Sequence, residues 1–403
     1  MISYERALSR ILSRVPKPVI QSVPLHRALG QILATPVWAT QALPPFKKSF
    51  MDGYALRSKD VREAPVVLNI IGRITAGVKS HFQISRNEAV KIMTGAPVPD
   101  TADAVQKVEK TRTVEAGIEI LEPVAPAQHV ASVGSEVEKG QLVLEKGRRI
   151  GPREVSILAC FGVAEVQIHK PPEVAIISTG DELIDIRKTP TFGQIRNSNA
   201  HMLWAQCQSA GVKADVEPIV MDDPEKIREA IRCVRNMDLV LLSGGVSMGE
   251  FDFVHTVLVE EGVDILFHKV AIKPGKPIMV GLDGERMIFG LPGNPVSAFV
   301  TFVLFVKPAL QQWCGVCSGS FQKIKVCLEK KIKHKPGKLF LMPGKVQKTG
   351  TQITACPIST KGSADMVGFA RANALLFIPS DRERLPEGSI VEAVLLDGFQ
   401  RFV

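Results

Sequence analysis

The sequence predicts a multidomain α/β protein in which a doubly wound α/β domain is combined with β-rich domains. Three observations support this prediction. The chain has 403 residues, which is more than one hydrophobic core ordinarily accommodates. Between residues 171 and 317, short apolar runs alternate with helical patterns. On both sides of this region, extended runs are instead separated by Gly, Pro and Asp.

The middle region is defined by its alternation of strands and helices. Expected strands cover residues 173–178, 213–220, 238–243, 263–270 and 286–290. Expected helices cover residues 199–210, 224–235, 253–261 and 295–310. Asp223 precedes the second of these helices and is expected to cap it. Strands and helices that alternate at this length predict a parallel, doubly wound sheet.

The flanking regions carry short extended pieces. Those in the first flank cover residues 66–70, 88–92, 104–110 and 118–123, and residues 140–170 continue in the same style. Those in the last flank cover residues 323–328, 352–356, 374–378 and 390–395. Such runs, bounded by turn residues, predict β-rich domains, including a small barrel-like domain at the C-terminus.

Composition limits the classes of partner. The net charge of +9 favours anions in general. Aromatic residues make up only 6%, and no run of five or six Lys/Arg occurs, so we expect no nucleic-acid partner. No apolar run approaches the ~20 residues that a membrane span needs. Residues 1–14 read as an amphipathic helix rather than a signal peptide, which predicts a cytoplasmic protein.

Cys314 and Cys317 have the spacing of a thiol–disulfide active site, among seven cysteines in all. That chemistry requires the first Cys at the start of a helix that follows a strand. Here an expected helix precedes the pair, with a stop at Lys307-Pro308, and Ser and Gly follow. The context favours a loop at a domain boundary.

Three expected strands end in loops rich in Gly and Ser. These loops cover residues 178–183 (STGDEL), 243–252 (SGGVSMGEFD) and 290–297 (GLPGNPVS). Ligands of open α/β sheets bind beyond the carboxyl ends of the strands, and Gly lets backbone N–H groups approach an anion. One such loop is most often an ordinary turn, but three on one sheet favour a phosphate or pterin site.

Several carboxylates lie in or beside these loops. Asp52, Glu182, Asp222 and Asp252 offer the oxygen ligands that Mg²⁺ prefers, usually one or two carboxylates with substrate oxygens. By local sequence alone, Asp52 is better explained by an Asp-Gly turn.

A stiff cationic segment completes the candidate site. Residues 272–277 (IKPGKP) place Lys273 and Lys276 between prolines, with Lys269 upstream. Lysine ammonium groups suit phosphate or molybdate as point charges. An ordinary solvated loop is the alternative. Residues 91–99 (KIMTGAPVP) add a loop in which Thr94 offers a hydroxyl group.

Six motifs in this order resemble the molybdopterin molybdenumtransferase family, which includes the C-terminal domain of gephyrin. The resemblance extends from about Tyr4 to about Pro379. The motifs are residues 49–55 (SFMDGYA), 93–99 (MTGAPVP), 178–183 (STGDEL), 243–247 (SGGVS), 272–277 (IKPGKP) and 291–297 (LPGNPVS).

The resemblance implies four domains and an elongated homodimer. Residues 1–20 and 171–317 would form the molybdopterin-binding α/β domain. Residues 21–40 and 140–170 would pair as a β linking domain, into which residues 41–139 are inserted. Residues 318–403 would form the C-terminal β domain. The active site would lie between the α/β domain of one subunit and the inserted domain of the other.

The resemblance also implies chemistry. The substrates would be molybdate and adenylylated molybdopterin, Mg²⁺ would engage the pyrophosphate, and AMP would leave. Asp52, Asp222 and Asp252 would hold the cation and molybdate. Glu182 would lie at the pterin-phosphate pocket, and Thr94 would reach the site from the partner subunit. Lys269, Lys273 and Lys276 would neutralise phosphate and oxyanion charge. The remaining substrate contacts would come from Thr179, Gly180, Ser243, Gly244, Gly245, Ser247, Pro292, Gly293, Asn294, Pro295 and Ser297.

Two positions depart from the family pattern. Residues 130–136 (VASVGSE) lack the arginines that the family often has there, and Glu136 stands where an Asp is expected. Asn197 stands where the family commonly has Asp. Because of these departures, two questions stay open. One is whether residues 130–136 supply positive charge to the site, and the other is whether Asn197 acts as a ligand.

Three alternatives remain beside the transferase. The chain could be a molybdopterin-binding scaffold or carrier, an enzyme that adenylylates molybdopterin, or a tungstate-selective homologue. The adenylylating enzyme would leave residues 41–139 and the C-terminal domain unexplained. A molybdopterin adenylyltransferase and molybdoenzyme acceptors are the partner proteins that the resemblance implies.

Overall fold

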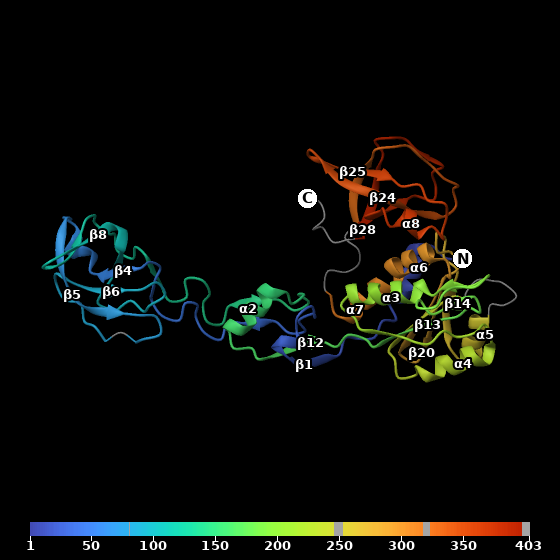
Figure 1. The fold of residues 1–403 in the computed structure, drawn as a ribbon, viewed down its shortest axis with the longest axis horizontal. Helices are drawn as coiled ribbons and strands as arrows, with labels where there is room; N and C mark the ends of the chain where they lie inside the picture. The colour runs from blue at the N-terminus through green and yellow to red at the C-terminus, as the bar shows by residue number, and fades with distance from the viewer. Residues whose placement is uncertain (80, 246–252, 317–322, 397–403) are drawn as a thin grey trace. The chain divides into compact units, whose positions relative to one another are not determined.

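The computed structural model describes residues 1–79, 81–245, 253–316 and 323–396 (Figure 1). The chain forms two compact units. The first contains residues 1–34, 147–151 and 165–403, and the second contains residues 35–146 and 152–164. No helix in the described ranges is both long enough and apolar enough to cross a membrane.

A six-stranded sheet forms the centre of the first unit. Its strand order is β16 (Ala214–Val216), β13 (Val174–Ser178), β17 (Leu239–Ser243), β21 (Arg286–Leu291), β20 (Met279–Asp283) and β18 (Asp264–His268). The strands from β16 to β21 run parallel, and β20 runs antiparallel to both of its neighbours. Every residue of β13, β17 and β21 is buried, as expected for strands covered on both faces.

Helices cover both faces of this sheet, which confirms the doubly wound prediction. One apolar core includes α1 (Tyr4–Leu12), α3 (Ser198–Ser209), α6 (Pro295–Thr301) and α7 (Lys307–Trp313). The other includes α4 (Pro224–Cys233) and α5 (Phe253–Glu260). The predicted amphipathic N-terminal helix is also confirmed, since α1 buries Tyr4, Ala7 and Ile11 and is capped by Ser3.

The structure corrects two predictions for this region and one for residues 140–170. The sheet is mixed, because β20 was not expected. Gly281 interrupts the apolar run of β20, which hides this strand in the sequence. The structure needs Gly at this position, because a Cβ there would lie 2.6 Å from Cγ1 of Val263 on the neighbouring chain segment. The last helix does not stop at Lys307-Pro308. It continues through a π-helical stretch, Phe302–Val306, into α7, with Pro308 in the first turn of α7. Residues 140–170 are not entirely β, because they contain α2 (Pro152–Cys160).

A closed five-stranded barrel forms the C-terminal region, which confirms the barrel-like prediction. The ring of strands is β24 (Leu339–Thr349), β25 (Gln352–Pro357), β22 (Lys323–Leu328), β28 (Ile390–Leu395) and β26 (Ala374–Ile378), and β26 pairs back with β24. The short strand β19 (Ile272–Lys273) of the α/β region pairs with β24. Two small elements accompany the barrel: the pair β23 (Ile332–Lys333) and β27 (Arg384–Leu385), and α8 (Met366–Phe369).

The second compact unit contains another six-stranded sheet. Its order is β7 (Ala104–Lys107), β4 (Gly53–Leu56), β6 (Glu88–Ile92), β5 (Val66–Ile74), β9 (Gly117–Ile120) and β8 (Thr111–Val114). Two apolar clusters pack against it. The short pairs β3 (Lys48–Ser49) with β10 (Val130–Ala131), and β2 (Val37–Trp38) with β11 (Leu142–Leu144), lie in the same unit.

Segments far apart in the sequence also pair in the first unit. Strand β1 (Ile20–Pro24) runs antiparallel to β12 (Glu165–His169), and Leu33 bridges to Ile168. In the α/β region, β14 (Leu183–Ile184) pairs with β15 (Ile195–Arg196). The β1–β12 pairing and the Leu33–Ile168 bridge join the segment after residue 20 to the segment before residue 170, while the four-domain division stays a prediction.

Candidate active site

A cavity of about 1230 Å³ lies where the α/β region meets the C-terminal barrel. The loops after three neighbouring parallel strands line it: Thr179 after β13, Gly244 and Gly245 after β17, and residues 292–297 after β21. Ser178 pairs with Ser243, and Ser243 pairs with Leu291, so the three loops begin at the same level of the sheet. Ligands of α/β sheets bind at this edge.

The glycines of the second loop allow a close approach between loops. Gly244 has φ +100°, and a Cβ there would lie 2.4 Å from the backbone oxygen of Thr179. Gly245 has φ +59°, and its Cβ would lie 2.7 Å from Cγ2 of Val254. Both positions combine a left-handed backbone with no room for a side chain, which explains why the sequence has Gly-Gly here.

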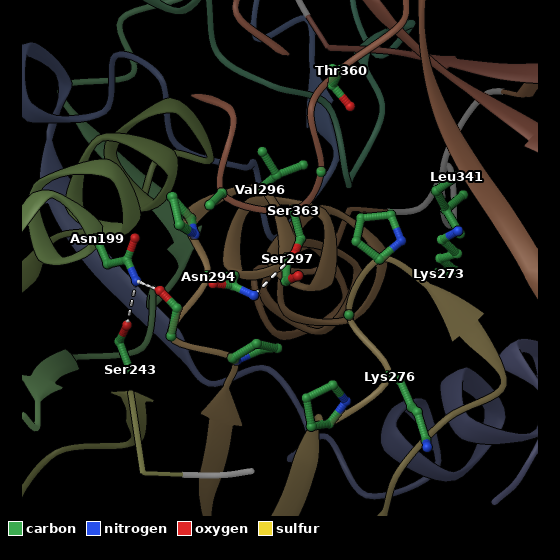
Figure 2. Close-up of a pocket in the computed structure, with 18 of the residues that line it drawn as sticks. Asn199, Ser243, Lys273, Lys276, Asn294, Val296, Ser297, Leu341, Thr360 and Ser363 are labelled. Carbon is green, nitrogen blue, oxygen red and sulfur yellow. Dashed lines mark hydrogen bonds between the residues drawn. The ribbon is translucent and has the colours of Figure 1, made fainter. Parts of the chain in front are cut away.

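Asn199 holds two of these loops together and was not predicted. Its Nδ2 donates to Oγ of Ser243 at 3.1 Å and to the carbonyl oxygen of Gly293 at 2.7 Å, as Figure 2 shows. Its Oδ1 is buried and has no hydrogen-bond partner among the described residues. Asn199 lies in the first turn of α3, where a polar residue reads as an ordinary helix start, so the sequence carried no distinguishing signal.

The C-terminal barrel region contributes the other wall, which the sequence did not predict. Nδ2 of Asn294 donates to Oγ of Ser363 at 2.9 Å (Figure 2), and the N–H of Val296 donates to the carbonyl oxygen of Ser363 at 3.1 Å. The loop after β21 is therefore tied to the loop after β25. The barrel region also lines the cavity with Lys333, His334, Lys338, Phe340 and Thr360.

Two of the three predicted lysines line the cavity. Lys273 and Lys276 are exposed and project from the predicted stiff loop, in which Gly275 is buried with φ +98°. Lys269 is not among the residues that line the cavity. It has φ +75°, and its backbone bonds to Ile2 and Ile278. With Lys333 and Lys338 of the barrel region, the cavity has a cationic side suited to phosphate or an oxyanion.

Carboxylates line another part of the same cavity. Glu182 and Asp222 line the cavity beside Thr179. Burial, and then the carboxylates of Asp181 and Glu182, raise the pKa of Asp222 above its usual range. Oδ1 of Asp222 and Oγ1 of Thr179 are both buried, and the Thr179 hydroxyl and the Asp181 backbone act on the Asp222 carboxylate in the opposite direction, toward a lower pKa. Asp223 caps α4, because its Oδ1 accepts from the N–H groups of Glu225 and Lys226, which confirms the prediction.

Of the three carboxylates predicted to hold the cation, Asp222 lines the cavity. In the described parts of the chain, no three His, Cys, Asp or Glu side chains group as a metal site. Asp252 and Ser247 lie outside the described residues. Asp52 and Thr94 belong to the second unit, where the N–H of Thr94 donates to Oδ1 of Asp52 at 2.8 Å. Asp52 is therefore more than a turn residue, because its carboxylate anchors the loop that carries Thr94.

The two departures from the family pattern have structural roles. Oδ1 of Asn197 accepts from the N–H of Ala200 at the start of α3 and from Oγ of Ser178. Asn and Asp serve almost equally well as caps. Glu136 pairs with Lys48 at 3.4 Å on the surface of the second unit.

The cysteine motif does not have the environment of a redox site. Cys314 follows the end of α7 instead of starting a helix, and burial raises the pKa of its thiol to about 11. A reactive thiol needs a lowered pKa. Cys317 lies outside the described residues.

Three consecutive parts of the chain match known protein-family models. Residues 2–162 match the MoeA N-terminal region (domain I and II). Residues 175–312 match a probable molybdopterin binding domain. Residues 325–396 match the MoeA C-terminal region (domain IV).

Individual relatives match almost the whole chain. Molybdopterin molybdenumtransferases of Staphylococcus aureus and Staphylococcus epidermidis are 34% and 33% identical to it, over 98% of this chain and 96% of theirs. The crystal structure of a molybdopterin biosynthesis MoeA protein from Pyrococcus horikoshii has a TM-score of 0.83 at 33% identity, covering 99% of this chain and 100% of that one. This chain belongs to the molybdopterin molybdenumtransferase (MoeA) family.

Proposed function

We propose that this chain inserts molybdate into adenylylated molybdopterin with hydrolysis and release of AMP, which yields the molybdenum cofactor. One observation carries the proposal: a single cavity gathers the three strand-end loops, Lys273, Lys276 and Asp222. A pyrophosphate and an oxyanion both need cations and N–H donors, and the cavity offers both. The family membership of the whole chain supports the same reaction.

Electrostatics would supply most of the catalysis. Water attacks the phosphoanhydride, the anhydride P–O bond breaks and AMP leaves, while the dithiolene sulfurs replace oxygens of molybdate, which take up protons and leave as water. Negative charge accumulates on the phosphate and molybdate oxygens during these steps. Lys273 and Lys276, which line the cavity, would neutralise it, and preorganised charges of this kind are usually the largest contribution in phosphoryl chemistry.

The acidic side of the cavity fits a hard divalent cation. Asp222 and Thr179 each bring a buried side-chain oxygen to the cavity, and a cation would find two oxygen ligands there. Mg²⁺ ordinarily takes only one or two carboxylates and completes its shell with water and substrate oxygens. Asp222 and Asp252 would hold it, and the bound ion would offset pyrophosphate charge. Glu182 would contact the pterin phosphate.

A second subunit would complete the site. Asp52 and Thr94 form one hydrogen-bonded pair in the second unit, and we propose that this pair faces the cavity of the partner subunit in an elongated homodimer. Asp52 would then help to hold the cation and molybdate. The enzyme would act in the cytoplasm, between a molybdopterin adenylyltransferase and molybdoenzyme acceptors.

The test is direct. Purified protein is incubated with adenylylated molybdopterin, molybdate and Mg²⁺, and AMP release and dithiolene metallation are measured. We expect both products in equal amounts. Binding without turnover would favour the scaffold or carrier instead. Tungstate in place of molybdate measures the preference for the oxyanion.

A further inference from the structure

The C-terminal barrel fixes the segment that carries Lys273. Strand β19 runs parallel to β24, and Lys273 and Phe340 are direct partners in this pairing. The N–H of Leu339 donates to the carbonyl oxygen of Ala271 at 3.0 Å. Both Lys273 and Phe340 line the cavity. The backbone thus places an aromatic ring of the barrel beside a lysine of the α/β region.

The Lys273 ammonium group lies over this ring. Its Nζ is 5.3 Å from the centroid of Phe340. Among the described residues, Lys273 has no carboxylate partner within ion-pair distance. The negative face of an aromatic ring attracts a cation without neutralising its charge. An ammonium group held in this way stays available to an anion, whereas a salt bridge would oppose anion binding.

His334 supports the ring from the same wall. Its imidazole stacks on Phe340 with centroids 5.8 Å apart and an interplanar angle of 30°. Both imidazole nitrogens are buried, and neither has a hydrogen-bond partner among the described residues. Packing against Phe340 therefore orients this side chain, and the contact in turn limits the motion of the Phe340 ring.

We propose that Phe340 is a positioning residue that holds the Lys273 ammonium group toward the cavity for its oxyanion. A free lysine samples many rotamers, and anion binding must remove that freedom. The cation–π contact removes part of it beforehand. The inference deepens the proposed function, because it assigns a role in that site to a residue of the barrel.

The experiment measures molybdate binding to the full chain by calorimetry. Phe340→Leu keeps an apolar side chain but removes the aromatic face, and we expect the Kd for molybdate to rise about fivefold. Phe340→Tyr keeps the face and should bind as the wild type does. Fluorinated phenylalanine analogues at position 340 keep the shape while weakening the negative face, so the Kd should rise with the number of fluorines. This series remains informative if Phe340→Leu does not fold.

A matched control separates this role from barrel stability. Nζ of Lys323 lies 4.6 Å from the centroid of Phe377, on the same barrel but outside the cavity. Phe377→Leu therefore removes a cation–π contact without touching Lys273, from a lysine that is also paired with Glu392 at 2.7 Å. We expect it to lower Tm and to leave the Kd for molybdate unchanged.

A double-mutant cycle tests whether Phe340 acts through Lys273. In a Lys273→Met background, Phe340→Leu should have no further effect on the Kd. An unchanged Kd in Phe340→Leu and in the fluorinated series, or the same fivefold loss in the Lys273→Met background, overturns the inference. The proposed function fails separately, when wild-type protein binds molybdate but releases no AMP.

Discussion

The backbone N–H of Thr94 donates to Oδ1 of Asp52 at 2.8 Å, across 42 residues of sequence. Sheet pairing brings the two residues together: Asp52 precedes β4, Thr94 follows β6, and Gly53 is the partner of Ile92. Both side chains are exposed at this end of the sheet. The Asp52 carboxylate can therefore act in two separable ways. It accepts a hydrogen bond from the loop that carries Thr94, and it offers a negative charge to a ligand.

Two substitutions of Asp52 separate these properties. Asp52→Asn keeps an oxygen that can accept from Thr94 but loses the charge, so Tm should stay unchanged while AMP release falls by about 10²–10³. Asp52→Ala should lose the same activity and also about 1 kcal/mol of stability with the hydrogen bond. Activity assays and thermal unfolding measure both effects. Wild-type turnover in Asp52→Asn would remove the charge from the mechanism.

Mixed dimers test whether two subunits share one site. If Asp52 of one subunit serves Asp222 of the other, a purified heterodimer of Asp52→Asn and Asp222→Asn has one site with both substitutions and one intact site. Such a heterodimer should recover about half of the wild-type activity, although both parent homodimers are inactive. Differently tagged chains allow its purification. An inactive heterodimer would place both residues in a site within one subunit.

The bond between Asn294 and Ser363 ties the α/β region to the barrel region at the cavity. Ser363→Ala should leave the Asn294 amide without this acceptor and cost about 1 kcal/mol. Because the loop after β21 loses part of its support, we expect KM for the pterin substrate to rise more than kcat falls. Steady-state kinetics measures the two effects. Ser380→Ala, a change at an exposed residue of the same barrel region that does not line the cavity, is the control, and an equal effect there would contradict the specific role of Ser363.

The sequence predicted the part of the site that local patterns determine. Strands such as β13 and β17 are continuous buried apolar runs, so their ends, and the glycine loops after them, could be located directly. The predicted cap at Asp223 belongs to the same class of local signal. Strand β24 was missed because Pro343 and Gly344 interrupt its pattern.

Contacts between distant segments could not be predicted in this way. Phe340 and Ser363 reach the cavity only because the barrel packs against the α/β region, and neither lies in a distinctive motif. Lys269 shows the converse case. It belongs to the same run of lysines as Lys273, but its backbone bonds to Ile2 and Ile278 and it does not line the cavity.

An ion-pair cluster between α4 and α5 predicts how stability changes with acid. Glu261 accepts from Arg232 at 2.7 and 2.9 Å and from Arg228 at 3.1 Å. The hydrogen bond from Arg232, followed by that from Arg228, lowers the pKa of Glu261 to about 2. The carboxylate thus titrates lower in the folded state than in the unfolded state, where its pKa is about 4.3.

The contribution of Glu261 to stability should therefore be complete above pH ~4.3 and disappear as the pH falls toward about 2. Glu261→Gln should have a lower Tm than the wild type at pH 7, and the difference should shrink between pH ~5 and about 2. Glu225→Gln is the control, because Glu225 is 78% exposed and lies 3.4 Å from Arg228, and exposed pairs contribute little. Thermal unfolding across this pH range measures both variants. A difference that does not change with pH would mean that packing of the side chain, and not its charge, holds α4 against α5.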